Sequence, residues 1–303
     1  HLDTGSIIIN VAIPLTPGNN RVKLYCTNKE GVSSYKEVIE IYSTSGTKKQ
    51  KTWFIGLGVA NYADTSNNLI YSVKDIRDLA KRFKEIYPEI IIDTLLNKQV
   101  TLKNLELLKK RLEKVTVSDR VIMAVTGHGV LSENLDFYYA TYDMDFKHPE
   151  SKGLPYDQLE QILNETPARQ KLLLIDACHS GLVDKENVVS AKSVVIEQDS
   201  TNGEINIKET RGIKPNVTQK VDEANTFNLM QNMFADFSND NGIVVISAAG
   251  GLEYAFESPR WNNGVFTYSV LKGLSGEAAI TYDSGISDNK ISVQELMRYV
   301  GSK

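Results

Sequence analysis

Cysteine is scarce in this sequence, with two residues in 303. So few thiols cannot build a disulfide framework, and their scarcity favours a reducing compartment. Basic residues are not in excess either, since 34 Lys and Arg stand against 38 Asp and Glu. This balance argues against a nucleic acid or an anionic membrane as partner.

Long apolar runs are also missing. No run approaches the ~20 residues that a membrane span needs, and the amino end has no signal-peptide pattern. We therefore expect a cytoplasmic protein. The chain begins at His1 rather than Met, so this expectation leaves an upstream signal open.

Strands and helices alternate from residue 52 onward. Apolar segments rich in β-branched residues are expected as strands at 52–60, 90–96, 119–127, 170–177 and 243–248. Segments with helical periodicity are expected as helices at 71–86, 101–115, 155–164, 264–274 and 293–300. This alternation predicts an α/β fold with a mainly parallel sheet flanked by helices on both faces. Asp93 interrupts its strand, so we expect that strand at or near the sheet edge.

Residues 1–45 have a different character, with apolar and polar residues alternating as in strands at 7–13, 21–26 and 37–42. Turns are expected at 17–20 and 28–31. Three strands bury little surface alone, so this segment is either the tail of an immunoglobulin-like sandwich or a sheet that packs on the next domain. A polar linker at 46–51 would join it to a domain at 52–303, and Cys26 is expected to be a small buried hydrophobe.

Two of the predicted strands end in residues that carry chemistry. The apolar run 171–175 leads into Asp176 and Cys178, and the run 120–126 leads into the glycine-flanked His128. The carboxyl ends of neighbouring parallel strands meet at one edge of a sheet, where α/β folds bind their ligands. A cysteine nucleophile needs an adjacent base or cation, and an imidazole supplies either. We therefore predict an acyl-transfer dyad of Cys178 and His128.

The backbone N–H groups of Gly129 and Cys178 could then bind a developing oxyanion. Taken singly, His128 and Cys178 would be unremarkable, because a buried cysteine is usually inert. Two other histidines fit the site less well. His179 should point to the opposite face of an extended chain from Cys178, and His148 lies in a polar loop.

Thr126-Gly127-His128-Gly129 and the segment 176–181, Asp-Ala-Cys-His-Ser-Gly, resemble the histidine and cysteine motifs of the caspase-like cysteine peptidases. The resemblance covers roughly residues 51 to 300 and is strongest to the metacaspase and bacterial caspase-homologue branch. It implies a cysteine endopeptidase. Two alternatives stay open: a catalytically silent scaffold or sensor with a caspase fold, and a related peptidase with another primary specificity, such as a separase-like or gingipain-like one.

The expected specificity depends on two acids. Asp176 lies on the same strand face as Cys178, because strand side chains alternate with period two. Metacaspases resemble this sequence in carrying Asp there and cleave after Arg or Lys, so the resemblance implies the same preference. Asp75 stands where their second pocket carboxylate lies. Alternatively, Asp75 serves only the start of its helix, and Asp176 is a structural acid held by backbone amides.

Two further segments differ from the rest of the domain. Residues 183–241 are polar, and the resemblance implies a processing loop between the two halves of the domain; a tolerated surface insertion fits the composition equally. The glycine-containing segment 249–257 resembles the substrate loop of the family, with Glu253 and Glu257 as candidate substrate-binding residues.

We expect no cofactor and no metal. His and Cys are too few for a four-ligand zinc site. The segment 283–294 lacks the Gly and Glu of a calcium-binding EF-hand loop, because Asp288 and Gln294 stand in their places. Some metacaspases are activated by calcium, and the sequence leaves that dependence open. The expected partners are a protein or peptide with Arg or Lys before the scissile bond and an upstream β-rich module of the same parent protein.

Overall fold

The structure is a computed structural model of the chain. It describes residues 9–30, 32–44, 50–132, 134, 136–177, 209–211, 242–248, 255–282 and 290–302, with the backbone alone at 209–211, 255–258 and 282. The chain divides into two compact units, His1–Gln50 and Lys51–Lys303.

The first unit contains a β-hairpin. Strand β1 (Gly18–Leu24) pairs antiparallel with β2 (Glu37–Ser43). The predicted turn at 17–20 is shorter than expected, because the chain bends at Pro17 and β1 already begins at Gly18. The Asn20 side chain bonds back to the backbone of Thr16 across this bend. The predicted turn at 28–31 is confirmed on its described residues, where the Asn28 N–H donates to the Val32 carbonyl at 3.0 Å. Residues 9–13 of the expected first strand have no strand structure.

Cys26 is exposed, which corrects the expectation that it would be buried. Two paired strands form a single layer, and a single layer has no second surface against which to bury its side chains. Leu24 and Ile39 share one face of this hairpin and are 49% and 46% exposed. The hairpin therefore leaves apolar side chains exposed.

The second unit is built on a five-stranded sheet, which confirms the predicted α/β fold. Its strands run in the order β11 (Ile243–Ser247), β9 (Gln170–Asp176), β5 (Arg120–Thr126), β3 (Thr52–Gly58) and β4 (Ile91–Leu96), and all neighbours are parallel. As expected from Asp93, β4 lies at an edge. The Arg111 Nη2 atom donates to Asp93 Oδ1 at 3.0 Å, so the acid that interrupts the strand is paired.

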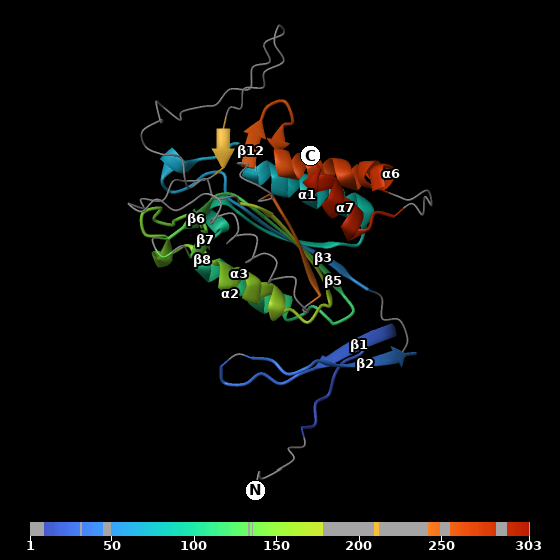
Figure 1. Cartoon of the computed structure of the whole chain (residues 1–303). Coiled ribbons are helices and arrows are strands. Elements are labelled where there is room, and N and C mark those ends of the chain that lie inside the picture. The colour runs from blue at the N-terminus through green and yellow to red at the C-terminus, as the bar shows by residue number, and fades with distance from the viewer. Residues whose placement is uncertain are drawn as a thin grey trace. The chain divides into compact units, whose positions relative to one another are not determined.

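Helices cover both faces of this sheet (Figure 1). One face carries α1 (Ser72–Ile86), α5 (Val265–Lys272) and α7 (Val293–Gly301), and the other carries α2 (Leu102–Leu112) and α3 (Tyr156–Asn164). Alternate residues along a strand pack on opposite faces of the sheet. Leu174 packs in the core with α1, α5 and α7, whereas Leu173 packs in the core with α2 and α3. The near-continuous apolar strands are thus explained by burial on both sides.

Short elements complete the unit. One small sheet consists of β6 (Gly129–Leu131), β7 (Phe137–Tyr139) and β8 (Leu154–Pro155), and another of β10 (Glu209–Arg211), β12 (Ala255–Ser258) and β13 (Asn263–Gly264). The remaining helices and turns are η1 (Thr65–Asn67), η2 (Asn97–Gln99), η3 (Pro149–Ser151), the π-helical η4 (Gly273–Glu277) and α6 (Ala278–Tyr282). None of the helices in the described ranges has the length and apolar character needed to cross a membrane.

Candidate active site

The ends of β5 and β9 lie side by side at the carboxyl edge of the sheet. Thr126 is the partner of Asp176 in the parallel ladder, and the Gly127 N–H donates to the Asp176 carbonyl at 3.2 Å. Gly129 then lies against the chain that follows β9, since a Cβ atom on Gly129 would come within 2.5 Å of the Ala177 oxygen. Any side chain at 129 would force these two segments apart. The histidine segment and the cysteine segment therefore meet one residue before Cys178.

Cys178 lies outside the described residues, and so do Glu253 and the segment 178–208 that contains His179. Gly129, the predicted oxyanion donor, belongs to β6 opposite Tyr139. Glu257 belongs to β12, where its backbone lies opposite Gly264. The other predicted site residues, His128, Asp176 and Asp75, are all described with their side chains.

His128 is buried, and its imidazole has a defined orientation. The Nε2 atom lies 2.9 Å from the backbone oxygen of Asn67. A carbonyl oxygen only accepts hydrogen bonds, so Nε2 carries the proton, and in a neutral imidazole the lone pair is then on Nδ1. The Asn67 carbonyl thus selects the tautomer in which Nδ1 can take a proton from a donor.

The short helix η1 holds this carbonyl in place. Its cap, Asp64, accepts hydrogen bonds from the Ser66 hydroxyl at 2.7 Å, the Ser66 N–H at 3.1 Å and the Asn67 side chain at 3.0 Å. These bonds, with those from Ser66 foremost, lower the pKa of Asp64. The carboxylate stays ionised and keeps the turn closed. The Asp-Thr-Ser-Asn sequence is a recognisable cap, but nothing in it indicates that Asn67 would reach His128.

Two aromatic rings enclose the imidazole. The Tyr62 ring centroid is 5.3 Å and the Phe146 ring centroid 5.9 Å from that of His128, the second edge-on at 88°. The Tyr62 hydroxyl also accepts a hydrogen bond from the His128 backbone N–H at 2.9 Å. Both the ring and the backbone of His128 are therefore fixed by residues that the sequence did not single out.

Asp176 is 1% exposed and faces the α1 and α5 side of the sheet. Its Oδ2 atom accepts a hydrogen bond from the Thr267 hydroxyl at 3.2 Å. Thr267 lies on α5 and is itself fully buried. That Asp176 is a structural acid held by backbone amides remains a prediction. The hydrogen bond to its Oδ2 atom comes from a side chain.

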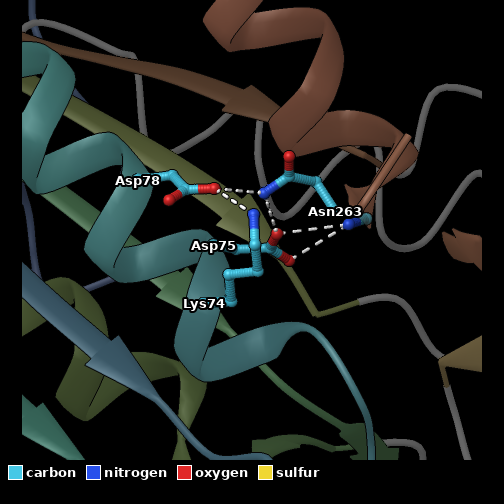
Figure 2. Close-up of polar contacts among 5 residues, drawn as sticks. Lys74, Asp75, Asp78 and Asn263 are labelled. Atoms are coloured by element: carbon cyan, nitrogen blue, oxygen red, sulfur yellow. Dashed lines mark hydrogen bonds and ion pairs between the residues drawn. The ribbon is translucent and has the colours of Figure 1, made fainter. Parts of the chain in front are cut away.

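Asp75 is fully buried on α1 and binds the start of α5 (Figure 2). Its Oδ1 atom accepts hydrogen bonds from the Asn263 side chain at 2.9 Å and from the Gly264 N–H at 3.2 Å. Gly264 is the N-cap of α5, so the carboxylate lies at the positive end of that helix. Asp75 also lies in the first turn of its own helix, so it stands near the starts of both α1 and α5.

Asn263 links Asp75 to a second acid. The same amide nitrogen donates to Asp78 Oδ2 at 2.8 Å, and Asp78 pairs with Lys74 at 2.5 Å (Figure 2). Asn263 is 5% exposed, so the amide joins a buried carboxylate to an ion pair nearer the surface. The Asn262-Asn263-Gly264 sequence gives no indication of this role.

Asp75 and Asp176 approach the same turn of α5. Their partners Gly264 and Thr267 are three positions apart, and residues at that spacing are neighbours on a helix surface. A further bond joins the two regions, since the Thr126 hydroxyl donates to the Ser72 carbonyl at 2.7 Å. The structure therefore gathers the two predicted acids beside the edge at which the histidine and cysteine segments meet.

Residues 55–302 match the caspase domain family. Among solved structures, the crystal structure of a protein from Geobacter sulfurreducens is similar with a TM-score of 0.49 and 17% sequence identity, over 82% of this chain and 88% of that one. No curated protein matches the chain.

Proposed function

The chain belongs to the caspase family, and we propose that it is a cysteine endopeptidase that hydrolyses peptide bonds after Arg or Lys. The observation that carries this proposal is the gathering of the oriented His128 and the buried Asp75 and Asp176 around the segment that leads into Cys178. The substrate would be a protein or peptide, and the reaction needs no cofactor.

The proposed reaction uses the tautomer that Asn67 selects. Nδ1 of His128 accepts the thiol proton, and the Cys178 thiolate attacks the scissile carbonyl. The imidazolium then protonates the leaving amine, and water hydrolyses the thioester. Backbone N–H groups of Gly129 and Cys178 would bind the oxyanion. Because Nε2 is already committed to a carbonyl, the ring cannot turn to present the wrong nitrogen.

The two acids support a basic residue before the scissile bond. Their described hydrogen bonds come from neutral donors, namely an amide, a backbone N–H and a hydroxyl. A carboxylate can accept paired, charge-assisted hydrogen bonds from a guanidinium and can bind an ammonium group, so two acids beside one pocket favour Arg or Lys. Two negative charges in a buried environment would discriminate strongly against an acidic side chain.

Fluorogenic peptides that differ only in the residue before the cleaved bond test the proposal. We expect turnover with Arg or Lys there, none with Asp, and loss of all turnover in Cys178→Ala and His128→Ala. Asp176→Ala should lower kcat/KM for the Arg peptide by about 30-fold or more, as losing one partner of a buried charge pair does.

The outcomes separate the alternatives. Turnover of the Asp peptide alone would contradict the acidic pocket but would still be consistent with Cys178 as the nucleophile. No turnover of any peptide, with Cys178→Ala equal to wild type, would indicate a catalytically silent scaffold. An Asp176→Ala protein that loses turnover and folding in equal measure would make this acid structural.

A further inference from the structure

The loop that follows β3 carries two groups that hold His128. The Tyr62 hydroxyl accepts a hydrogen bond from the His128 N–H at 2.9 Å, and the Asn67 carbonyl oxygen lies 2.9 Å from Nε2 of the imidazole. Both residues belong to the segment 60–69, in which most residues are exposed. The orientation of the imidazole therefore depends on how this loop is attached to the rest of the domain.

The loop is closed on itself by two hydrogen bonds. The Leu69 N–H donates to the Ala60 carbonyl at 2.8 Å, and the Asn68 side-chain oxygen accepts a bond from the Tyr62 N–H at 2.8 Å. Together with the capped turn η1, these bonds make the loop one compact piece. A compact loop moves as a unit, so its attachment points decide where the groups that hold the imidazole lie.

Asn97 attaches the base of this loop to the end of β4. Its Oδ1 atom accepts hydrogen bonds from the backbone N–H groups of Ala60 and Asn61, both at 2.9 Å. A second attachment is made by backbone groups, from the Ala63 N–H to the Tyr142 carbonyl at 2.9 Å. One side-chain oxygen thus ties two successive N–H groups of the loop to a strand that lies 36 positions further along the chain.

The backbone of Asn97 explains why this residue type stands there. Its φ is 50°, in the left-handed region that Asn and Asp enter more readily than other residues with a side chain. The parallel ladder places Leu96 beside Gly58, so Asn97 lies next to the chain that leaves β3. The positive φ ends β4 there and begins η2. Glycine could adopt the same φ but would bring no acceptor.

We propose that Asn97 is a positioning residue for His128. By holding the loop, its side-chain oxygen keeps the Asn67 carbonyl at Nε2 and maintains the tautomer in which Nδ1 accepts a proton. Without this attachment the carbonyl shifts away from the ring, and both neutral tautomers become populated. The consequence for catalysis rests on the proposed function, whereas the tautomer is a property of the fold.

Two variants at this position separate the acceptor from the backbone conformation. Asn97→Gly keeps the positive φ and removes the acceptor, whereas Asn97→Asp keeps both. Lys98→Ala, at the exposed next position, is the matched control.

Nuclear magnetic resonance of the full chain, labelled with nitrogen-15 at its histidines, reports the tautomer directly. The His128 signals are assigned from their loss in His128→Ala. Wild type, Asn97→Asp and Lys98→Ala should carry the proton on Nε2, and Asn97→Gly should show a mixture of the two tautomers.

Steady-state kinetics with the Arg peptide measure the consequence for catalysis. Asn97→Gly should lower kcat by about 10-fold or more, the loss that two ordinary hydrogen bonds represent. KM should stay within about two-fold, because the loop holds the imidazole. Asn97→Asp should keep kcat within about three-fold of wild type, since its carboxylate accepts the same two bonds.

The two readouts distinguish the kinds of failure. With an active wild type, an unchanged tautomer or kcat in Asn97→Gly would overturn this inference and leave the proposed function. So would an Asn97→Asp protein as impaired as Asn97→Gly, or an Asn97→Gly protein that does not fold, which would make Asn97 a residue of fold stability. A wild type that turns over no peptide, with a tautomer that still shifts in Asn97→Gly, would overturn the proposed function and support the positioning role.

Discussion

At the scale of single residues, the side-chain amide of Asn263 does much to position the acids Asp75 and Asp78. Asn263 donates to both Asp75 and Asp78 from a buried position. A buried carboxylate that loses a donor costs about 1–3 kcal/mol. The orientation of Asp75 therefore depends on a side chain that would not itself touch a substrate, and Asn263 is a positioning residue.

We expect Asn263→Ala to lower the free energy of unfolding by about 1–3 kcal/mol and to raise KM for the Arg peptide more than it lowers kcat. Urea unfolding and steady-state kinetics measure the two effects. Asn164→Ala, at an exposed position at the end of α3, should change stability by less than about 0.5 kcal/mol. Unchanged stability and KM in Asn263→Ala would show that the amide does not hold Asp75.

The two acids Asp75 and Asp176 could be predicted from the sequence, but the residues that position the site could not. Asp176 is recognisable from its place two residues before Cys178, and Asp75 through the resemblance to the metacaspases. Asn67, Tyr62 and Asn263 act through contacts 61, 66 and 188 positions away along the chain. Such partners depend on how elements pack, and no local pattern specifies them. The bonds from Asp75 to the start of α5 likewise depend on packing and could not be predicted from the sequence.

At the scale of elements, the long strands and helices follow from their periodicity, and the short strands do not. The five strands of the central sheet were predicted within two residues or so, because their apolar runs are long and the inner strands β3, β5 and β9 bury both faces. Strands β8 and β13 have two residues each, and β6, β7 and β10 have three. A stretch of two or three residues contains too little alternation to recognise. Those short strands nevertheless position Gly129 and Gly264.

At the same scale, strand β9 contains a buried lysine, which is unusual for a central strand. Lys171 lies between Val121 and Ile243 of the neighbouring strands, and burial lowers the pKa of its amine to about 8 from its ordinary value of 10.5. Between pH 8 and 10.5 the unfolded chain holds a proton that the folded chain has lost, so stability rises with pH across this window. Below it, both states are charged and folding carries the full cost of burying the charge.

Lys171→Met should therefore stabilise the fold most at pH 7, and the gain should shrink as the pH rises from 8 to 10.5. Chemical unfolding of wild type and variant at several pH values gives this difference directly. Lys110→Met, at an exposed position of α2, should show no such trend. A gain for Lys171→Met that is the same at every pH would mean that the amine is well solvated in the folded chain.

At the scale of the whole molecule, every described residue of the candidate site belongs to the unit Lys51–Lys303. The site combines segments near residues 62–75, 126–129, 176 and 263–267, which come together only when the helices pack on the sheet. The first unit contributes a hairpin with exposed apolar residues, in keeping with strands that bury little surface alone. It also contributes the exposed Cys26, the second thiol of the chain.

The two cysteines allow one direct test of the central claim, that Cys178 is an activated nucleophile beside a pocket for a basic side chain. The full chain is treated with a peptide acyloxymethyl ketone that ends in Arg, and the adduct is located by peptide mass mapping. We expect one adduct, on Cys178, absent in His128→Ala and absent when the reagent ends in Asp. Labelling of Cys26 alone, or equal labelling of Cys178 by the Arg and Asp reagents, would contradict the account.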